Sequence, residues 1–267
     1  MKLSTCLLSI LILSAVRALA AGTTPFAGGQ WVDLSHDFSA ETIYWPTAHG
    51  FELETEHKGM TPGGYFYAAN RYSASEHGGT HIDAPIHFAE GHQTVDQIPL
   101  EGLTGEAILV DVSVQAGTNA DYLVNPGDFT AWEKKHGKIP KGAIVLLNTG
   151  YAQYWPDAKK YLGTDEKGEE GVAKLHFPGL HPEAAKWLVK ERGIKAIGLD
   201  TASIDYGQSK LFETHRILFK NNVPAFENVA GLDQLPVTGA YVVALPMKIK
   251  GGSGGPLRIV AWVAKKS

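Results

Sequence analysis

Residues 77–87 read HGGTHIDAPIH and bring three histidines and an aspartate together within eleven residues. These four residues, His77, His81, Asp83 and His87, all occupy odd-numbered positions. In an extended strand, side chains of equal parity point to one face, whereas a helix would direct Asp83 away from the histidines. The two glycines and the proline of the segment also disfavour a helix. We therefore expect a broken strand or loop that presents all four side chains on one side.

A straight strand could not gather these side chains around one point. Residues 77 to 83 would span roughly 20 Å if fully extended, far more than a coordination sphere. Gly78 and Gly79 permit the sharp bend that is needed, because glycine adopts backbone conformations closed to other residues. Imidazole nitrogens with a carboxylate suit zinc, manganese, iron or cobalt, and the histidine content disfavours magnesium and calcium. The segment therefore predicts a site for a divalent metal.

The charge of the chain narrows the class of partner. The 267 residues carry a formal charge of −4, and the pI is near 6.3. A chain without excess positive charge has no general attraction for nucleic acid or for an anionic membrane. We therefore expect a small-molecule partner. No stretch resembles a linker, and the chain is long enough to bury a large core, so residues 21–267 are expected to form a single domain.

Residues 1–20 follow the pattern of a secretory signal peptide. Lys2 precedes an apolar run from Leu7 to Val16, and Ala18-Leu19-Ala20 stands before a plausible cleavage point. The run is short for a bilayer span, which makes an uncleaved membrane anchor the weaker alternative. Cys6, the only cysteine, lies inside this segment, so the mature chain would hold no disulfide. We expect a protein that is secreted to the periplasm or the exterior.

Apolar, β-branched runs alternate with helical patterns along the rest of the chain. Pro182–Arg192 and Phe129–His136 each begin with helix-start signals or apolar spacing and end at a glycine. Asp157–Gly171 is polar and glycine-rich, so we expect an exposed loop there. The predicted strands are Ala107–Val112, Ala143–Leu147, Ile194–Leu199, Tyr241–Leu245 and Leu257–Val263. This alternation predicts an α/β domain with a central, partly parallel sheet.

The segment HGGTHIDAPIH resembles the H-x-G-T-H-x-D-x-P-x-H signature of the cyclase family of metal-dependent hydrolases. That family includes bacterial kynurenine formamidases and isatin hydrolases. The similarity continues over nearly the whole mature chain. It runs through FPGLHPEAAKWL at 177–188, the Gly198-Leu199-Asp200 strand end, the segment from His215 to Glu227, and the LP-x-x-G-A motif with its continuation at 235–249.

The resemblance implies a set of metal ligands and a cofactor. The ligands would be His77, His81, Asp83, His215 and Glu227, with the aspartate able to bridge two ions. The cofactor would be zinc or manganese, as one or two ions per chain. Taken alone, His215 could instead be a helix-surface residue, and Glu227 an exposed loop carboxylate.

The resemblance also implies the remaining roles in the site and the fold. His87 would donate and accept protons, and Trp45 would line the substrate pocket, although Trp45 could also be ordinary core or rim packing. The implied fold is the swivelling β/β/α domain with a central mixed sheet and flanking helices, assembled as a homo-oligomer. Independently of the resemblance, Asp200 and Asp205 follow a strand end, so we expect them to support the ligands by hydrogen bonds.

Together these residues predict a secreted metal-dependent amidohydrolase. The leading substrate is a small aryl formamide like N-formylkynurenine, an arylformamidase activity of tryptophan catabolism, although export fits that pathway poorly. Glu227 favours this branch, because isatin hydrolases tend to lack an acidic residue there. The alternatives are a hydrolase of isatin or of another cyclic amide or lactone, and a secreted metal-binding protein without catalysis.

Overall fold

The computed structural model describes residues 26–265. The predicted signal peptide, residues 1–20, and its alternative as a membrane anchor lie outside the described residues. Within residues 26–265, no helix has the length and apolar character that crossing a bilayer requires.

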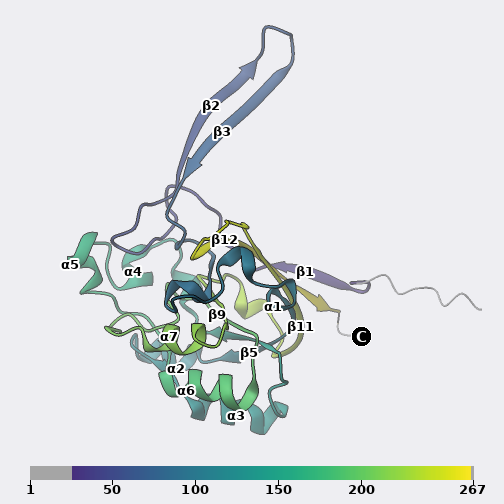
Figure 1. The fold of residues 1–267 in the computed structure, drawn as a ribbon, viewed down its shortest axis with the longest axis vertical. Helices are drawn as coiled ribbons and strands as arrows, with labels where there is room; N and C mark the ends of the chain where they lie inside the picture. The colour runs from purple at the N-terminus through teal and green to yellow at the C-terminus, as the bar shows by residue number, and fades with distance from the viewer. Residues whose placement is uncertain (1–25, 266–267) are drawn as a thin grey trace, which may run out of the picture.

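A mixed sheet that closes on itself forms the centre of the molecule (Figure 1). Its strands follow the order β1-β12-β11-β5-β7-β9-β10-β4, and β4 also pairs with β12, which closes a ring of seven strands. Strands β5, β7, β9 and β10 run parallel to their neighbours in that series, and the other pairs are antiparallel. The strands of this sheet are β1 (Gly29–Asp33), β4 (His81–Asp83), β5 (Thr104–Asp111), β7 (Ile144–Asn148), β9 (Ala196–Leu199), β10 (Ala225–Glu227), β11 (Thr238–Pro246) and β12 (Gly254–Ala264).

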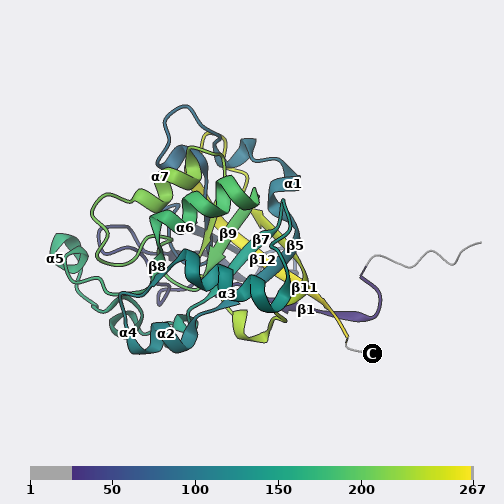
Figure 2. The same ribbon diagram turned by 90° about the horizontal axis from the view of Figure 1, so that it is seen from below.

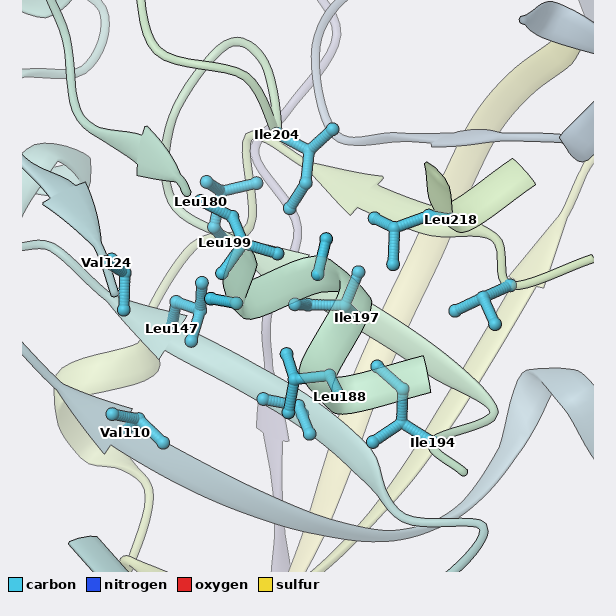
Figure 3. Close-up of a cluster of buried hydrophobic side chains, with 14 of the residues drawn as sticks. Val110, Val124, Leu147, Leu180, Leu188, Ile194, Ile197, Leu199, Ile204 and Leu218 are labelled. Carbon is cyan, nitrogen blue, oxygen red and sulfur yellow. The ribbon is translucent and has the colours of Figure 1, made fainter. Parts of the chain in front are cut away.

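Side chains along these strands alternate between two hydrophobic layers, as expected for strands buried on both faces. On β5, Ala107 and Leu109 belong to a cluster to which all seven strands of the ring contribute, so this cluster fills the ring. Ile108 and Val110 belong to a second cluster, shared with the helices outside the ring. Figure 3 shows part of this outer layer, in which Leu188 lies beside residues of the parallel strands.

Helices cover the outer face of the parallel strands (Figure 2). The predicted helix at 129–136 is α3 (Pro126–His136), which the Asn125 side chain caps. The predicted helix at 182–192 is α6 (Pro182–Trp187) continued by the π-helical turn η4 (Leu188–Arg192). The remaining helices are α1 (Leu100–Leu103), α2 (Ser113–Thr118), α4 (Ala158–Leu162), α5 (Gly168–Val172) and α7 (Glu213–Phe219), with 3-10 turns η1 (Pro85–His87), η2 (Val95–Gln97), η3 (Tyr151–Tyr154) and η5 (Leu232–Gln234).

The predicted α/β fold with a central mixed sheet and flanking helices is confirmed, and each predicted strand is present. The finer assignment to the swivelling β/β/α architecture stays a prediction. The expectation of an exposed loop at 157–171 is wrong at both ends, which form α4 and the start of α5. Tyr161 and Leu162 of α4 are buried and pack near Phe177. The surrounding glycines and charges hide this apolar pair in the sequence.

Two small sheets complete the fold. Strands β6 (Leu123–Val124) and β8 (Gly179–Leu180) form a short parallel pair. Strands β2 (Glu52–Met60) and β3 (Phe66–Ser73) form an antiparallel hairpin, which we name the arm. The arm projects away from the rest of the molecule (Figure 1), and within the described residues it pairs with no other strand.

Candidate metal centre

The signature segment folds as a short strand between a bend and a 3-10 turn. Gly79 adopts a φ of +58°, and a Cβ added there would lie 2.6 Å from the Phe38 ring, so both backbone and space require glycine. The bend returns His77 to the side of β4, where its Nδ1 lies 2.6 Å from Oδ1 of Asp83. The predicted bend at the glycines is therefore present. After β4, the turn η1 places His87 beside the same carboxylate.

The register of β4 against β10 joins two distant parts of the sequence. His81 lies directly opposite Glu227 in this antiparallel pair. Ile82 and Phe226 point into the core of the ring, so the side chains of His81, Asp83 and Glu227 share the other face. Nε2 of His81 lies 3.2 Å from Oδ1 of Asp83 and 3.4 Å from Oε2 of Glu227. These three residues offer ligand atoms that lie within 4.8 Å of one another.

Helix α7 brings the fifth predicted ligand to this face. Nε2 of His215 lies 3.1 Å from Oδ2 of Asp83 and 3.2 Å from Oε1 of Glu227. His215 is 2 % exposed and Glu227 is 3 % exposed, which excludes the alternatives of a surface histidine and an exposed carboxylate. The structure therefore brings all five predicted ligands together.

His87 lies at the edge of this cluster. Its ring stacks on that of His77, with centroids 3.8 Å apart, and its Nε2 lies 4.0 Å from Oδ2 of Asp83. Burial lowers the pKa of His87 to about 4, and the raising effect of Asp83 does not offset it. The ring is therefore neutral at pH 7, with one ring nitrogen unprotonated. His77, Asp83 and His87 also form a second group of ligand atoms within 4.8 Å, so Asp83 belongs to both groups.

Two observations show that the cluster suits a cation. Nε2 of His81 is buried and makes no hydrogen bond, while its Nδ1 lies 2.9 Å from the Gly79 carbonyl, which fixes the proton on Nδ1. A buried acceptor without a partner is costly, and a cation would pair with it.

His77 gives the second observation. Ser253 donates to Glu76, so its Oγ accepts from Nε2 of His77, and a proton or cation must then lie between Nδ1 and Asp83.

The pKa shifts of the buried ligand groups also reflect their close contacts with one another. Burial opposes charge on His215, but its hydrogen bonds with Asp205, Asp83 and Glu227 hold its pKa well above the usual range. Burial would raise the pKa of Asp83, yet the contacts with His77 and His215 hold it well below its usual range. Burial and the charge of Asp83 together raise the pKa of Glu227. Protons on these groups and a divalent cation compete for the same lone pairs.

The two predicted supporting aspartates have different contacts. Asp205 accepts from the backbone N–H of His215 and lies 2.6 Å from its Nδ1, so it orients this ring. Asp200 contacts none of the predicted ligands through its carboxylate. It accepts instead from the N–H and Oγ1 of Thr149, at 2.8 and 2.7 Å, and from the N–H of Ala152, and so holds the turn that follows β7.

A cavity of about 380 Å³ opens onto the cluster. Trp45, Phe88 and Phe212 form part of its apolar wall. Trp45 is half-buried and also packs edge-on against Phe177. Phe212 has a φ of +47°, a strained conformation for a bulky residue and one that often marks a functional site. The sequence alone does not point to Phe88 or Phe212, although each stands within three residues of a predicted site histidine.

Asn228 is a further residue of the site that the sequence pattern does not indicate. Its Nδ2 donates to the Gly79 carbonyl at 2.7 Å, the same oxygen that receives His81 Nδ1. Its Oδ1 accepts from the Tyr161 hydroxyl at 2.8 Å. Its position directly after Glu227 is the only local signal. Asn228 therefore connects the bend before β4 to the end of β10.

Comparisons with known proteins give the relatives of this chain. The Cyclase family model matches residues 32–206. Isatin hydrolase of Roseibium aggregatum is 32% identical over 210 residues, covering 76% of this chain and 77% of that protein. Kynurenine formamidase of Bacillus cereus is 28% identical over 231 residues, covering 86% and 96%. Among solved structures, isatin hydrolase A from Ralstonia solanacearum superimposes with a TM-score of 0.81 at 33% identity, covering 96% of this chain and 100% of that one.

Proposed function

Because the chain belongs to the Cyclase family, we propose that it is a metal-dependent hydrolase that cleaves the amide bond of a small aryl formamide, with N-formylkynurenine as the model substrate. Its relatives include an isatin hydrolase and kynurenine formamidases, which act on amide bonds. The observation that carries the proposal is the unpaired, buried Nε2 of His81 beside the carboxylates of Asp83 and Glu227. This cluster faces an open cavity.

The five residues His77, His81, Asp83, His215 and Glu227 would hold one or two ions of zinc or manganese. Their imidazole and carboxylate donors suit either metal. When bound, a divalent cation lowers the pKa of water toward about 7 and polarises a carbonyl oxygen.

The chain itself would supply proton transfer and orientation. His87 is neutral at pH 7 and partly exposed, so it can take a proton from the attacking water. The same ring can then protonate the amine nitrogen, which leaves readily only in its protonated form. Trp45, Phe88 and Phe212 would pack against a planar aryl group and exclude bulk water from one side. No serine or cysteine nucleophile is required.

A panel of three substrates tests the choice of bond. Protein reconstituted separately with zinc, manganese and cobalt is assayed on an aryl formamide, isatin and an aryl lactone. The proposal expects the highest kcat/KM on the formamide, because Glu227 supplies an acidic residue at a position where isatin hydrolases tend to lack one. Isatin is the second candidate, since two isatin hydrolases are 32–33% identical to this chain and the kynurenine formamidase of Bacillus cereus is 28% identical. A higher kcat/KM on isatin would move the assignment to ring opening.

One outcome of this panel would contradict hydrolysis altogether. Absence of turnover on all three substrates with every metal would favour a metal-binding protein without catalysis.

Secretion through residues 1–20 is a separate part of the proposal. Expression of the full chain with mass analysis of the exported product tests it, and a mature N-terminus near residue 21 is the expected result.

A further inference from the structure

Ser253 contacts the ring nitrogen of His77 that does not face the cluster. Its Oγ lies 2.9 Å from Nε2 of His77, whereas Nδ1 of the same ring lies 2.6 Å from Oδ1 of Asp83. Oε2 of Glu76 accepts from both the N–H and the hydroxyl of Ser253, at 3.0 and 2.7 Å. A serine hydroxyl carries one proton, so only lone pairs of Oγ remain for Nε2 of His77. Glu76 therefore fixes Ser253 as a hydrogen-bond acceptor toward the imidazole.

This direction decides which nitrogen of His77 can bind a metal. Nε2 carries the proton that Ser253 accepts, so the lone pair of Nδ1 is the one directed at Asp83 and the cluster. His81 has the opposite arrangement, because its Nδ1 bonds to the Gly79 carbonyl and its Nε2 faces the cluster. The two histidines of one short segment are therefore presented through different ring nitrogens.

Ser253, His77 and Asp83 have the contacts of a Ser-His-Asp triad, but the hydroxyl proton lies elsewhere. In such a triad the serine gives its proton to the imidazole and becomes a nucleophile. Here the hydroxyl donates to Glu76, and the described residues that line the cavity do not include Ser253. Ser253 is therefore suited to holding the imidazole in place rather than to attacking a substrate.

The glycine-rich loop that carries Ser253 is fixed by backbone hydrogen bonds. A run such as GGSGG at 251–255 is typical of a flexible linker. In this fold, however, the Gly252 carbonyl accepts from the N–H of Val95 at 3.0 Å. The Ser253 carbonyl accepts from the N–H of Ala84 at 2.8 Å. Because the backbone is held at both residues, the Ser253 hydroxyl keeps a fixed place, as the support of a metal ligand requires.

Gly254 leaves room for the ring of His77. It begins β12 and lies opposite Asp83 in the pairing of β12 with β4. A Cβ on Gly254 would lie 2.6 Å from Cε1 of His77 and 2.5 Å from the Ile82 carbonyl oxygen, closer than side-chain atoms approach. The same ring stacks on that of His87. A displaced His77 would therefore also disturb the residue proposed to carry the proton.

We propose that Ser253 and Glu76 are positioning residues that hold His77 so that its Nδ1 binds the metal. This inference rests on the proposed function, because His77 is a ligand only if the cluster holds a cation. Without the hydroxyl, Nε2 of His77 would lose its acceptor, and the ring would be free to turn or to carry its proton on Nδ1. Loss of a partner of this kind typically lowers metal affinity about 10- to 100-fold.

A pair of variants of equal shape tests the hydroxyl. Ser253→Thr keeps an oxygen for Nε2 of His77, whereas Ser253→Val has nearly the same shape without it. In competition with a chromophoric chelator, Ser253→Val should bind zinc about 10- to 100-fold more weakly than the wild type, and Ser253→Thr within about threefold of it. Ser253→Ala should repeat the loss with a smaller side chain. The control Ser35→Ala removes a hydroxyl that bonds to the backbone of Ile259 in β12, and it should keep the wild-type affinity.

Glu76 and the ring of His77 give two further measurements. Glu76→Gln keeps an acceptor oxygen for the Ser253 hydroxyl, so it should bind zinc more tightly than Glu76→Ala. Nitrogen-15 spectra of the zinc-loaded wild type should show the proton of His77 on Nε2. The signal that is lost in His77→Gln identifies this ring.

The outcomes separate this proposal from the proposed function. Wild-type affinity in Ser253→Ala, equal affinities of Ser253→Thr and Ser253→Val, or a proton on Nδ1 of His77 in the zinc-loaded protein would overturn it and leave the metal centre intact. A wild type that binds no zinc would contradict the metal centre itself, and this proposal with it. None of these measurements uses hydrolysis, so they do not depend on which amide is the substrate.

Discussion

Oδ2 of Asp205 lies 2.6 Å from Nδ1 of His215, and this contact directs the other ring nitrogen toward Asp83 and Glu227. The backbone N–H groups of Thr214 and His215 also donate to Asp205. A single carboxylate thus holds both the first turn of α7 and the imidazole that it presents. Partners of this kind set the tautomer and orientation of metal-binding histidines.

The variant Asp205→Asn should weaken binding of zinc or manganese about 10- to 100-fold, the usual effect of losing such a partner. Competition with a chromophoric chelator measures this affinity. Asp200→Asn is the matched control, because the carboxylate of Asp200 bonds to Thr149 and Ala152 rather than to a ligand. Its metal affinity should change less than about threefold. Equal losses in the two variants would contradict a specific role for Asp205.

The variant His87→Ala should keep the metal content and lower kcat by roughly 100-fold or more, because it removes the proposed proton carrier. Elemental analysis and steady-state kinetics on the aryl formamide are measured on the same sample. His92→Ala, which removes a partly buried histidine outside the cluster, should leave both unchanged. Loss of bound metal from His87→Ala would instead identify His87 as a ligand, in line with its place beside His77 and Asp83.

His36 predicts a pH dependence of stability that is independent of the site. It stacks on Trp155, its Nε2 is buried without a partner, and burial lowers the pKa of His36 to about 4 despite Asp37. In the unfolded chain the pKa is near 6.5, so between about pH 6.5 and 4 the unfolded chain binds more protons. The free energy of unfolding therefore keeps its full value above about pH 6.5 and decreases as the pH falls through this window.

Urea unfolding at pH 7.5 and pH 4.5 measures this effect. The wild type should lose on the order of 1–2 kcal/mol more than His36→Phe, which keeps a ring against Trp155 but cannot be protonated. Identical losses in the two proteins would show that His36 takes up no extra proton on unfolding.

The bend that positions His77 predicts a position-specific cost of substituting glycine. Gly79→Ala combines an unfavourable positive φ with a clash against Phe38, so the free energy of unfolding should fall by about 2–4 kcal/mol. Gly91 also has a positive φ, +75°, but a Cβ there meets nothing within 4 Å. Gly91→Ala should therefore cost only about 1 kcal/mol. Similar midpoints in urea for both variants would mean that the contact with Phe38 is unimportant.

Short sequence patterns predict those parts of the molecule whose structure depends on residues that are neighbours in the chain. The parity of His77, His81 and Asp83 and the glycines between them are enough to predict a bent strand with its polar side chains gathered. The apolar runs likewise predict the strands of the ring, because strands buried on both faces have continuous apolar sequences. The C-terminal part of helix α3 follows from the glycine that ends it, whereas its start at Pro126 precedes the predicted one at Phe129.

Contacts between distant segments were beyond such reasoning. His215 and Glu227 reach the site only through the packing of α7 and the register of β10 against β4, so their prediction depended on the family resemblance. Phe212 and Asn228 have no recognisable motif.

Metal removal and restoration tests the central claim most directly. The protein is treated with a strong chelator, dialysed and then titrated with zinc or manganese. Bound metal and hydrolysis of the aryl formamide are measured in the same samples. We expect the metal-free protein to be inactive and turnover to return in proportion to one or two bound ions per chain. Full hydrolysis by the metal-free protein, or binding of metal that His81→Ala leaves unchanged, would contradict the account.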